Sequence, residues 1–171
     1  MRKRVFLSAL AFAVGAVVFV VAAVAGSSGV VSARVTAVSA GDTLQVRLSS
    51  GKRLTVHVLG ISAPPKGSCF ATEAKAATTA LALNRTVKLS TAASAAYVKL
   101  ADGTDLGAKL VGDGNAQIDA LGTPFSRLPR YVPLQQAAEK ANKGLWGACA
   151  ADLSVDLVAT TTAVAVGGDV K

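Results

Sequence analysis

Few side chains in this sequence have the chemistry to catalyse a reaction or to hold a ligand. The chain contains one histidine, His57, and two cysteines, Cys69 and Cys149. A metal site built from these three is not expected, because the sequence has no CxxC spacing and no second histidine. His57 has no partner carboxylate in its own loop, which makes it a weak candidate for general acid–base catalysis. The alternative is an outward-facing strand residue on the protein surface.

A second group of side chains could contact phosphate. Arg127, Arg130 and Tyr131 lie close together in a proline-containing stretch, residues 120–133, that is predicted to be a loop. Guanidinium groups beside an aromatic ring are typical of sites that bind nucleic acid. A solvated loop without a ligand is the alternative interpretation. Trp146 is similarly open to two interpretations, packing against the core or stacking on a base.

The beginning of the chain predicts export. Arg2, Lys3 and Arg4 precede an apolar stretch, residues 5–25, and small residues follow up to Ala33. This order is typical of a secretory signal peptide cut after Ala33. The apolar stretch is also about long enough to cross a bilayer, so residues 1–33 could instead stay attached as an N-terminal membrane anchor. Both alternatives place the remainder outside the cytoplasm, either secreted or anchored to the membrane.

Charge and cysteine content fit an exported domain. Without Arg2, Lys3 and Arg4 the chain keeps 15 basic and 10 acidic residues. Such an excess permits a partner that is a polyanion, such as nucleic acid, an anionic lipid surface or an acidic wall polymer, without requiring one. In an oxidising compartment Cys69 and Cys149 are expected to form a disulfide, and two separate buried thiols are the alternative.

Hydrophobic patterning predicts one domain, residues 34–150, followed by a low-complexity tail, residues 151–171. Alternating apolar residues and turn residues predict strands at residues 34–38, 43–48, 53–59, 86–90 and 96–100. Helical patterns cover residues 69–83, 106–111 and 134–143, the last with Pro133 near its start. The predicted fold class is α+β, mainly β: a five-stranded OB-type barrel with two to three helices.

Several strings of the sequence, in this order, resemble the staphylococcal nuclease-like family over residues 34–149. They are Ala40-Gly41-Asp42-Thr43, residues 58–64 (VLGISAP), residues 69–74 (CFATEA) and Lys143-Gly144-Leu145-Trp146. The resemblance implies a barrel that carries a calcium-dependent nuclease site. In the family two aspartates and a backbone carbonyl hold calcium, a glutamate acts as the base and two arginines neutralise the phosphate.

This sequence departs from that catalytic set at most positions. Asp42 stands at the first calcium ligand, but Ser62 replaces the second aspartate, and Ala63 offers only its backbone carbonyl. His57 replaces the first arginine and Pro65 replaces the base. Residues 91–95, where the second arginine is expected, contain no cation. Asp42, Ser62 and Ala63 thus form at most a remnant calcium site, and Asp42 has an alternative role as a turn former.

Loss of a base and of charge-stabilising groups each typically costs orders of magnitude in rate. The sequence therefore predicts an exported, nuclease-like domain without catalysis and without a required cofactor, which acts by binding nucleic acid, another polyanion or an envelope protein. The alternative is a metal-dependent extracellular phosphodiesterase with a rearranged site. That enzyme would use Asp42 and His57 and would need a further carboxylate, such as Asp102, Asp105 or Asp119.

Overall fold

A computed structural model describes residues 29–150 except 92, 120–121 and 123. The expected export segment up to Ser28 and the expected tail from residue 151 lie outside the described residues. Within the described part, no helix has the length and apolar character needed to span a membrane.

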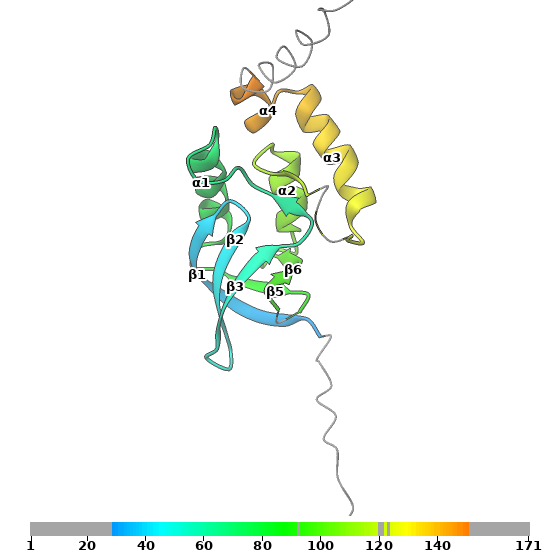
Figure 1. Cartoon of the computed structure of the whole chain (residues 1–171). Coiled ribbons are helices and arrows are strands. Elements are labelled where there is room, and N and C mark those ends of the chain that lie inside the picture. The colour runs from blue at the N-terminus through cyan, green and yellow to red at the C-terminus, as the bar shows by residue number, and fades with distance from the viewer. Residues whose placement is uncertain (1–28, 92, 120–121, 123, 151–171) are drawn as a thin grey trace, which may run out of the picture.

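The described residues form an α+β fold in which a nearly closed, barrel-like sheet is covered by helices at one end (Figure 1). The strands are β1 (Val31–Ala40), β2 (Thr43–Leu48), β3 (Arg53–Val58), β4 (Ile61–Ser62), β5 (Thr86–Leu89), β6 (Ala95–Ala96), β7 (Val98–Lys99) and β8 (Gln117–Ile118). The helices are α1 (Ala71–Ala82), α2 (Leu106–Gly112), α3 (Leu128–Lys140) and α4 (Leu145–Ala148).

The main sheet has the order β6-β3-β2-β1-β5-β7, and β4 pairs with β8 in a small second sheet. The predicted meander is confirmed, since β1, β2 and β3 pair in sequence as antiparallel neighbours. The predicted fifth strand, residues 96–100, is divided at Tyr97. Its first part, β6, pairs parallel to β3, and its second part, β7, pairs antiparallel to β5. These two short strands therefore connect the two edges of the sheet and bring it close to closure.

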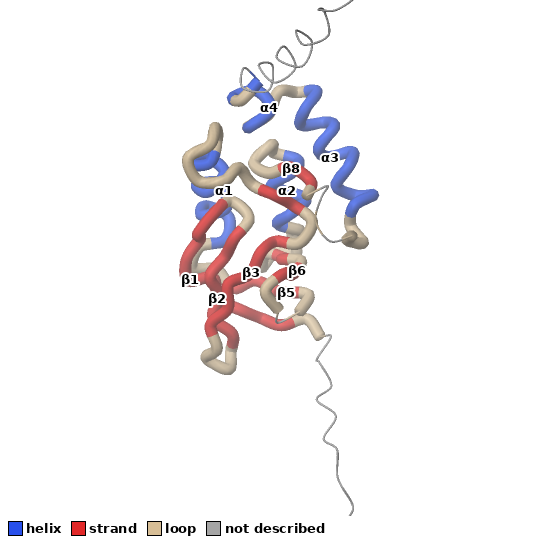
Figure 2. The backbone as a smooth tube through the Cα atoms, in the orientation of Figure 1, coloured by secondary structure: helices blue, strands red, loops and turns tan. Residues whose placement is uncertain are grey.

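Alternation along the strands decides which side chains fill the barrel. Ala33, Val35, Leu44 and Val46 are among the buried core residues, whereas Ser32, Arg34 and Arg47 beside them in the strands are exposed. In Figure 2 the strands of the main sheet lie mostly below the helices, β8 lies beside α2, and the β2–β3 hairpin extends away from the helices. The sheet thus has an apolar inner face and a polar outer face.

The starts of two elements differ from the sequence prediction by three residues or more. Strand β1 begins at Val31, three residues before the predicted domain boundary, because residues 31–34 pair with β5. Helix α3 begins at Leu128, so Pro133 lies inside the helix rather than near its start. The prediction that Arg130 and Tyr131 belong to a loop was therefore wrong, because both lie in the first turns of this helix.

The predicted disulfide is confirmed. Cys69 and Cys149 are bonded, with their Cα atoms 5.9 Å apart. The bond joins the segment just before α1 to the residue just after α4, at the end of the molecule where the helices gather.

Candidate functional site

The turn between β1 and β2 positions Asp42. Gly41 is required there because a Cβ atom at this position would lie 2.7 Å from the Cβ of Ala63 and 3.0 Å from that of Ala74. The Thr78 hydroxyl donates a hydrogen bond to the carbonyl of Gly41 and so fixes the turn to helix α1. This close approach places the Asp42 carboxylate beside the β4 segment.

Both oxygens of the Asp42 carboxylate accept hydrogen bonds from the protein. The Thr43 hydroxyl donates to Oδ1 at 2.7 Å, and the backbone N–H of Ala63 donates to Oδ2 at 3.0 Å. Ala63 thus contacts Asp42 through its N–H group, whereas the resemblance assigned a role to its carbonyl. These bonds are those of a carboxylate that ties a turn to a neighbouring strand.

Thr43 also connects Asp42 to His57. The distance between Thr43 Oγ1 and His57 Nδ1 is 3.1 Å, and Thr43 and His57 are directly opposite each other on β2 and β3. Because the single hydroxyl proton of Thr43 is donated to Asp42, Nδ1 of His57 carries a proton and donates to the threonine. The Nε2 atom of a neutral His57 is then the unprotonated nitrogen. His57 is exposed on the outer face of β3, as the sequence predicted.

A hollow of about 290 Å³, here called the His57 pocket, brings three of the predicted residues together. It is lined by Asp42, His57 and Ser62, by Asp119 beyond the end of β8, and by residues 58–61 and Ala95. Of the three further carboxylates suggested from the sequence, Asp119 is the one that lines this pocket with Asp42. Asp102 instead accepts a hydrogen bond from the N–H of Thr104 in its own turn.

The His57 pocket is acidic. Its lining contains two carboxylates and one imidazole, and no lysine or arginine is among the lining residues. Among the residues that the structure describes, no group of three or more His, Cys, Asp or Glu side chains is arranged to hold a metal ion. Calcium takes six to eight oxygen ligands. Asp42, Ser62 and Asp119 offer few such oxygens, and both Asp42 oxygens already have partners, so this donor set does not fit calcium well.

The residues predicted to contact phosphate lie around a buried carboxylate, that of Asp105. Asp105, with 4% of its surface exposed, accepts a hydrogen bond from the Tyr131 hydroxyl at 3.1 Å and pairs with Arg127 at 2.7 Å. It also caps helix α2 by accepting from the N–H of Ala108. Arg130 is 3.9 Å away from the same carboxylate. The cluster therefore neutralises a buried aspartate and joins α2 to α3.

Tyr131 is not available to a ligand. It is fully buried in the core, and burial, followed by the negative charge of Asp105, raises the pKa of its phenol above the ordinary value. The prediction of a Tyr131 contact with phosphate is corrected by this burial. Arg127 does contact an aromatic ring, because its guanidinium lies 3.9 Å from the centroid of Tyr97.

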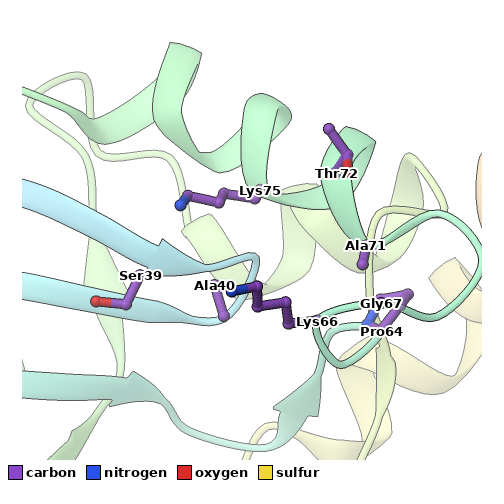
Figure 3. Close-up of a pocket in the computed structure, with 8 residues that line it drawn as sticks. All are labelled: Ser39, Ala40, Pro64, Lys66, Gly67, Ala71, Thr72 and Lys75. Carbon is purple, nitrogen blue, oxygen red and sulfur yellow. The ribbon is translucent and has the colours of Figure 1, made fainter.

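A further hollow lies on the other side of the β1–β2 turn. This lysine pocket, of about 270 Å³, is lined by Ser39, Ala40, Pro64, Lys66, Gly67, Ala71, Thr72 and Lys75. Figure 3 shows Lys66 and Lys75 extending toward the end of strand β1, which carries Ser39 and Ala40. Neither lysine is in an ion pair among the described residues.

Comparison with known proteins adds no relative: no protein family model and no curated protein sequence matches this chain.

Proposed function

We propose that this chain is a degenerate, non-catalytic member of the staphylococcal nuclease-like family, with an OB-type barrel, that works outside the cytoplasm as a binding or structural module of the cell envelope. The order of strands and helices and the quoted strings support the family. The Cys69–Cys149 disulfide supports an oxidising compartment.

The main support for a lack of catalysis is that the His57 pocket has two carboxylates and no cation in its lining. A phosphate diester gains negative charge on its oxygens in the transition state, and fixed cations supply most of the stabilisation of that charge. Asp42 and Asp119 would repel the substrate instead. The pocket also lacks a set of oxygen ligands that could bind calcium and offset this charge.

The test is a nuclease assay on single-stranded DNA with calcium, comparing the unaltered protein with Asp42→Ala. We expect both proteins to leave the DNA intact. Cleavage by the unaltered protein that disappears in Asp42→Ala would refute the proposal.

The second candidate function is a metal-dependent phosphodiesterase with a rearranged site. The observation in its favour is that Asp119 lines one pocket together with Asp42 and His57. This enzyme would use a metal other than calcium. Turnover with manganese or zinc that is lost in His57→Gln and in Asp119→Asn, and kept in Asp102→Asn, would establish it.

A further inference from the structure

The outer face of the main sheet carries a row of five exposed cations, here called the basic row: Arg53, Arg47, Arg34, Lys88 and Lys99. The strand register makes them neighbours. Arg47 is directly opposite both Arg53 and Arg34, and Lys88 is directly opposite Lys99. Ser32, two residues before Arg34 on the same face of β1, is opposite Lys88 and links the two parts of the row.

Nothing within these strands neutralises the basic row. None of β1, β2, β3, β5 and β7 contains an aspartate or a glutamate, and no row residue is in an ion pair among the described residues. Like charges directly opposite each other destabilise a sheet. The three like-charged pairs therefore work against folding, which is the arrangement expected where an anionic ligand supplies the missing charge.

Two hollows lie on this row. The arginine hollow, of about 260 Å³, is lined by Arg34 and Arg47 and by the hydroxyl residues Ser32, Ser49 and Thr86. Guanidinium groups bind phosphate through paired hydrogen bonds, and hydroxyl groups can donate further ones. No acidic residue is in the lining.

The tyrosine hollow, of about 520 Å³, begins at Lys88 on the other side of Ser32. It is lined by Val30, Lys88, Leu89, Ser90, Tyr97, Lys99, Leu100, Ala101, Gly103 and Arg127. The Tyr97 ring with the Arg127 guanidinium against it forms a flat wall, and Val30 is 71% exposed beside it. Two ammonium groups thus stand next to an apolar space with an aromatic wall, as in sites where a phosphate and its base are bound together.

We propose that the basic row binds single-stranded nucleic acid, with phosphates in the arginine hollow and along the lysines and a base in the tyrosine hollow. This inference rests on the proposed binding role and gives it a site and a ligand. Measured along the sheet, the row crosses four strand spacings, or about 19 Å. Because the sheet curves into a barrel, a flexible linear polyanion can follow the row, whereas a flat membrane cannot. A phosphate polymer without bases would leave the tyrosine hollow empty.

The row is separate from the His57 pocket. Arg47 lies four residues after Thr43 along β2, so the arginine hollow is about 13 Å from the position that pairs with His57. Binding at the row therefore needs neither Asp42 nor a metal.

The experiment measures fluorescence anisotropy of a labelled oligothymidine of roughly 20 nucleotides, longer than a typical single-strand site. It uses the full chain in EDTA, between about 50 and 200 mM salt. We expect Arg34→Gln/Arg47→Gln to raise Kd at least about tenfold. The slope of log Kd against log salt should become shallower by about 1.4, since each phosphate contact on a single strand contributes about 0.7.

The matched control is Lys66→Gln/Lys75→Gln, which removes the same charge from the lysine pocket and should keep the slope. An equal loss of affinity in both double variants would overturn the assignment of the basic row as the binding site. A lack of binding by the unaltered protein would overturn it as well. Equally tight binding of inorganic polyphosphate would overturn the nucleic-acid assignment, and so would binding to phosphatidylglycerol vesicles that depends on the same arginines. Thermal unfolding verifies that the variants are folded. Calcium-dependent cleavage that requires Asp42 would refute the proposed function while leaving this binding result unaffected.

Discussion

Asp105 is the residue on which the packing of α2 against α3 most depends. Its buried carboxylate has three hydrogen-bond partners, Arg127, Tyr131 and the N–H of Ala108. Replacing it with alanine leaves the Tyr131 hydroxyl without its partner and the Arg127 charge without a counter-ion. We expect Asp105→Ala to lower the free energy of unfolding by about 3 kcal/mol, measured by urea denaturation.

Asp113→Ala is the control for that change. Asp113 pairs with Lys109 at 2.7 Å, but both side chains are about 40% exposed. Such a surface pair contributes about 0.3–0.5 kcal/mol. Equal losses in the two variants would contradict the structural role given to Asp105.

Tyr131 predicts a pH dependence of stability. Burial and Asp105 raise the pKa of its phenol above the ordinary value of about 10. Below pH 10 both the folded and the unfolded chain keep the phenolic proton, and the contribution of Tyr131 to the stability of the fold is fully present. Above pH 10 the unfolded chain releases it first, so stability falls as pH rises.

The expected contribution is about 1.4 kcal/mol per pH unit above pH 10. It is measured as the difference in urea unfolding between the unaltered protein and Tyr131→Phe at pH 9, 10 and 11 (roughly the range over which free tyrosine titrates). Tyr97→Phe should keep the slope, because Tyr97 is only half-buried. An unchanged slope in Tyr131→Phe would show that another group is responsible.

At the scale of elements, the basic row opposes the pairing of its own strands. Arg47 has an arginine directly opposite on each side, Arg34 on β1 and Arg53 on β3. Replacing it with glutamine removes two repulsions, and we expect the free energy of unfolding to rise by about 0.2–1 kcal/mol at low salt. The gain should shrink in about 1 M salt, where exposed charges are screened. Lys140→Gln on α3 is the control, because it removes one positive charge away from the basic row. A lower free energy of unfolding in Arg47→Gln would contradict the inference that the basic row destabilises the sheet.

The elements also show what the sequence could predict. Alternation identified β1, β2, β3 and β5, because a half-buried strand has a period of two residues. It could not show that residues 95–99 divide into β6 and β7, since that depends on which edges meet when the sheet curves. Helix α3 was predicted to begin after Pro133, because a proline inside a helix removes a backbone hydrogen bond. It begins instead at Leu128 and continues through Pro133, and its first part carries the buried Tyr131.

The candidate site was predictable only in part. Asp42, His57 and Ser62 were located from local strings, and the structure places them in one pocket. Arg127, Arg130 and Tyr131 suggested a ligand site, but Arg127 and Tyr131 are bonded to Asp105, more than 20 residues earlier in the chain. The basic row was not predicted, because its residues lie far apart in sequence and only the strand register brings them together.

At the scale of the whole molecule, the disulfide and the barrel bear on the position of the export segment. The Cys69–Cys149 bond closes residues 69–149 into one loop and leaves strands β1 to β4 outside it. Strand β1 begins at Val31, and residues 31–34 pair with Leu89, Lys88, Val87 and Thr86. Ala33 is 2% exposed. A cut after Ala33 would therefore remove part of a core strand and Ser32, which lines the arginine hollow.

We accordingly expect any exported form of the chain to begin upstream of Val31, either because cleavage occurs earlier than the sequence suggested or because the segment is retained as an anchor. Intact-mass measurement of protein recovered from outside the cytoplasm checks this. In urea unfolding, a chain that begins at Arg34 should be less stable than one that begins at Gly29 by about 2 kcal/mol, from the lost strand hydrogen bonds and the lost burial of Ala33. A mature chain that starts at Arg34 with equal stability would show that the first three residues of β1 contribute nothing to the fold, and the arginine hollow would then lack Ser32 in the working protein.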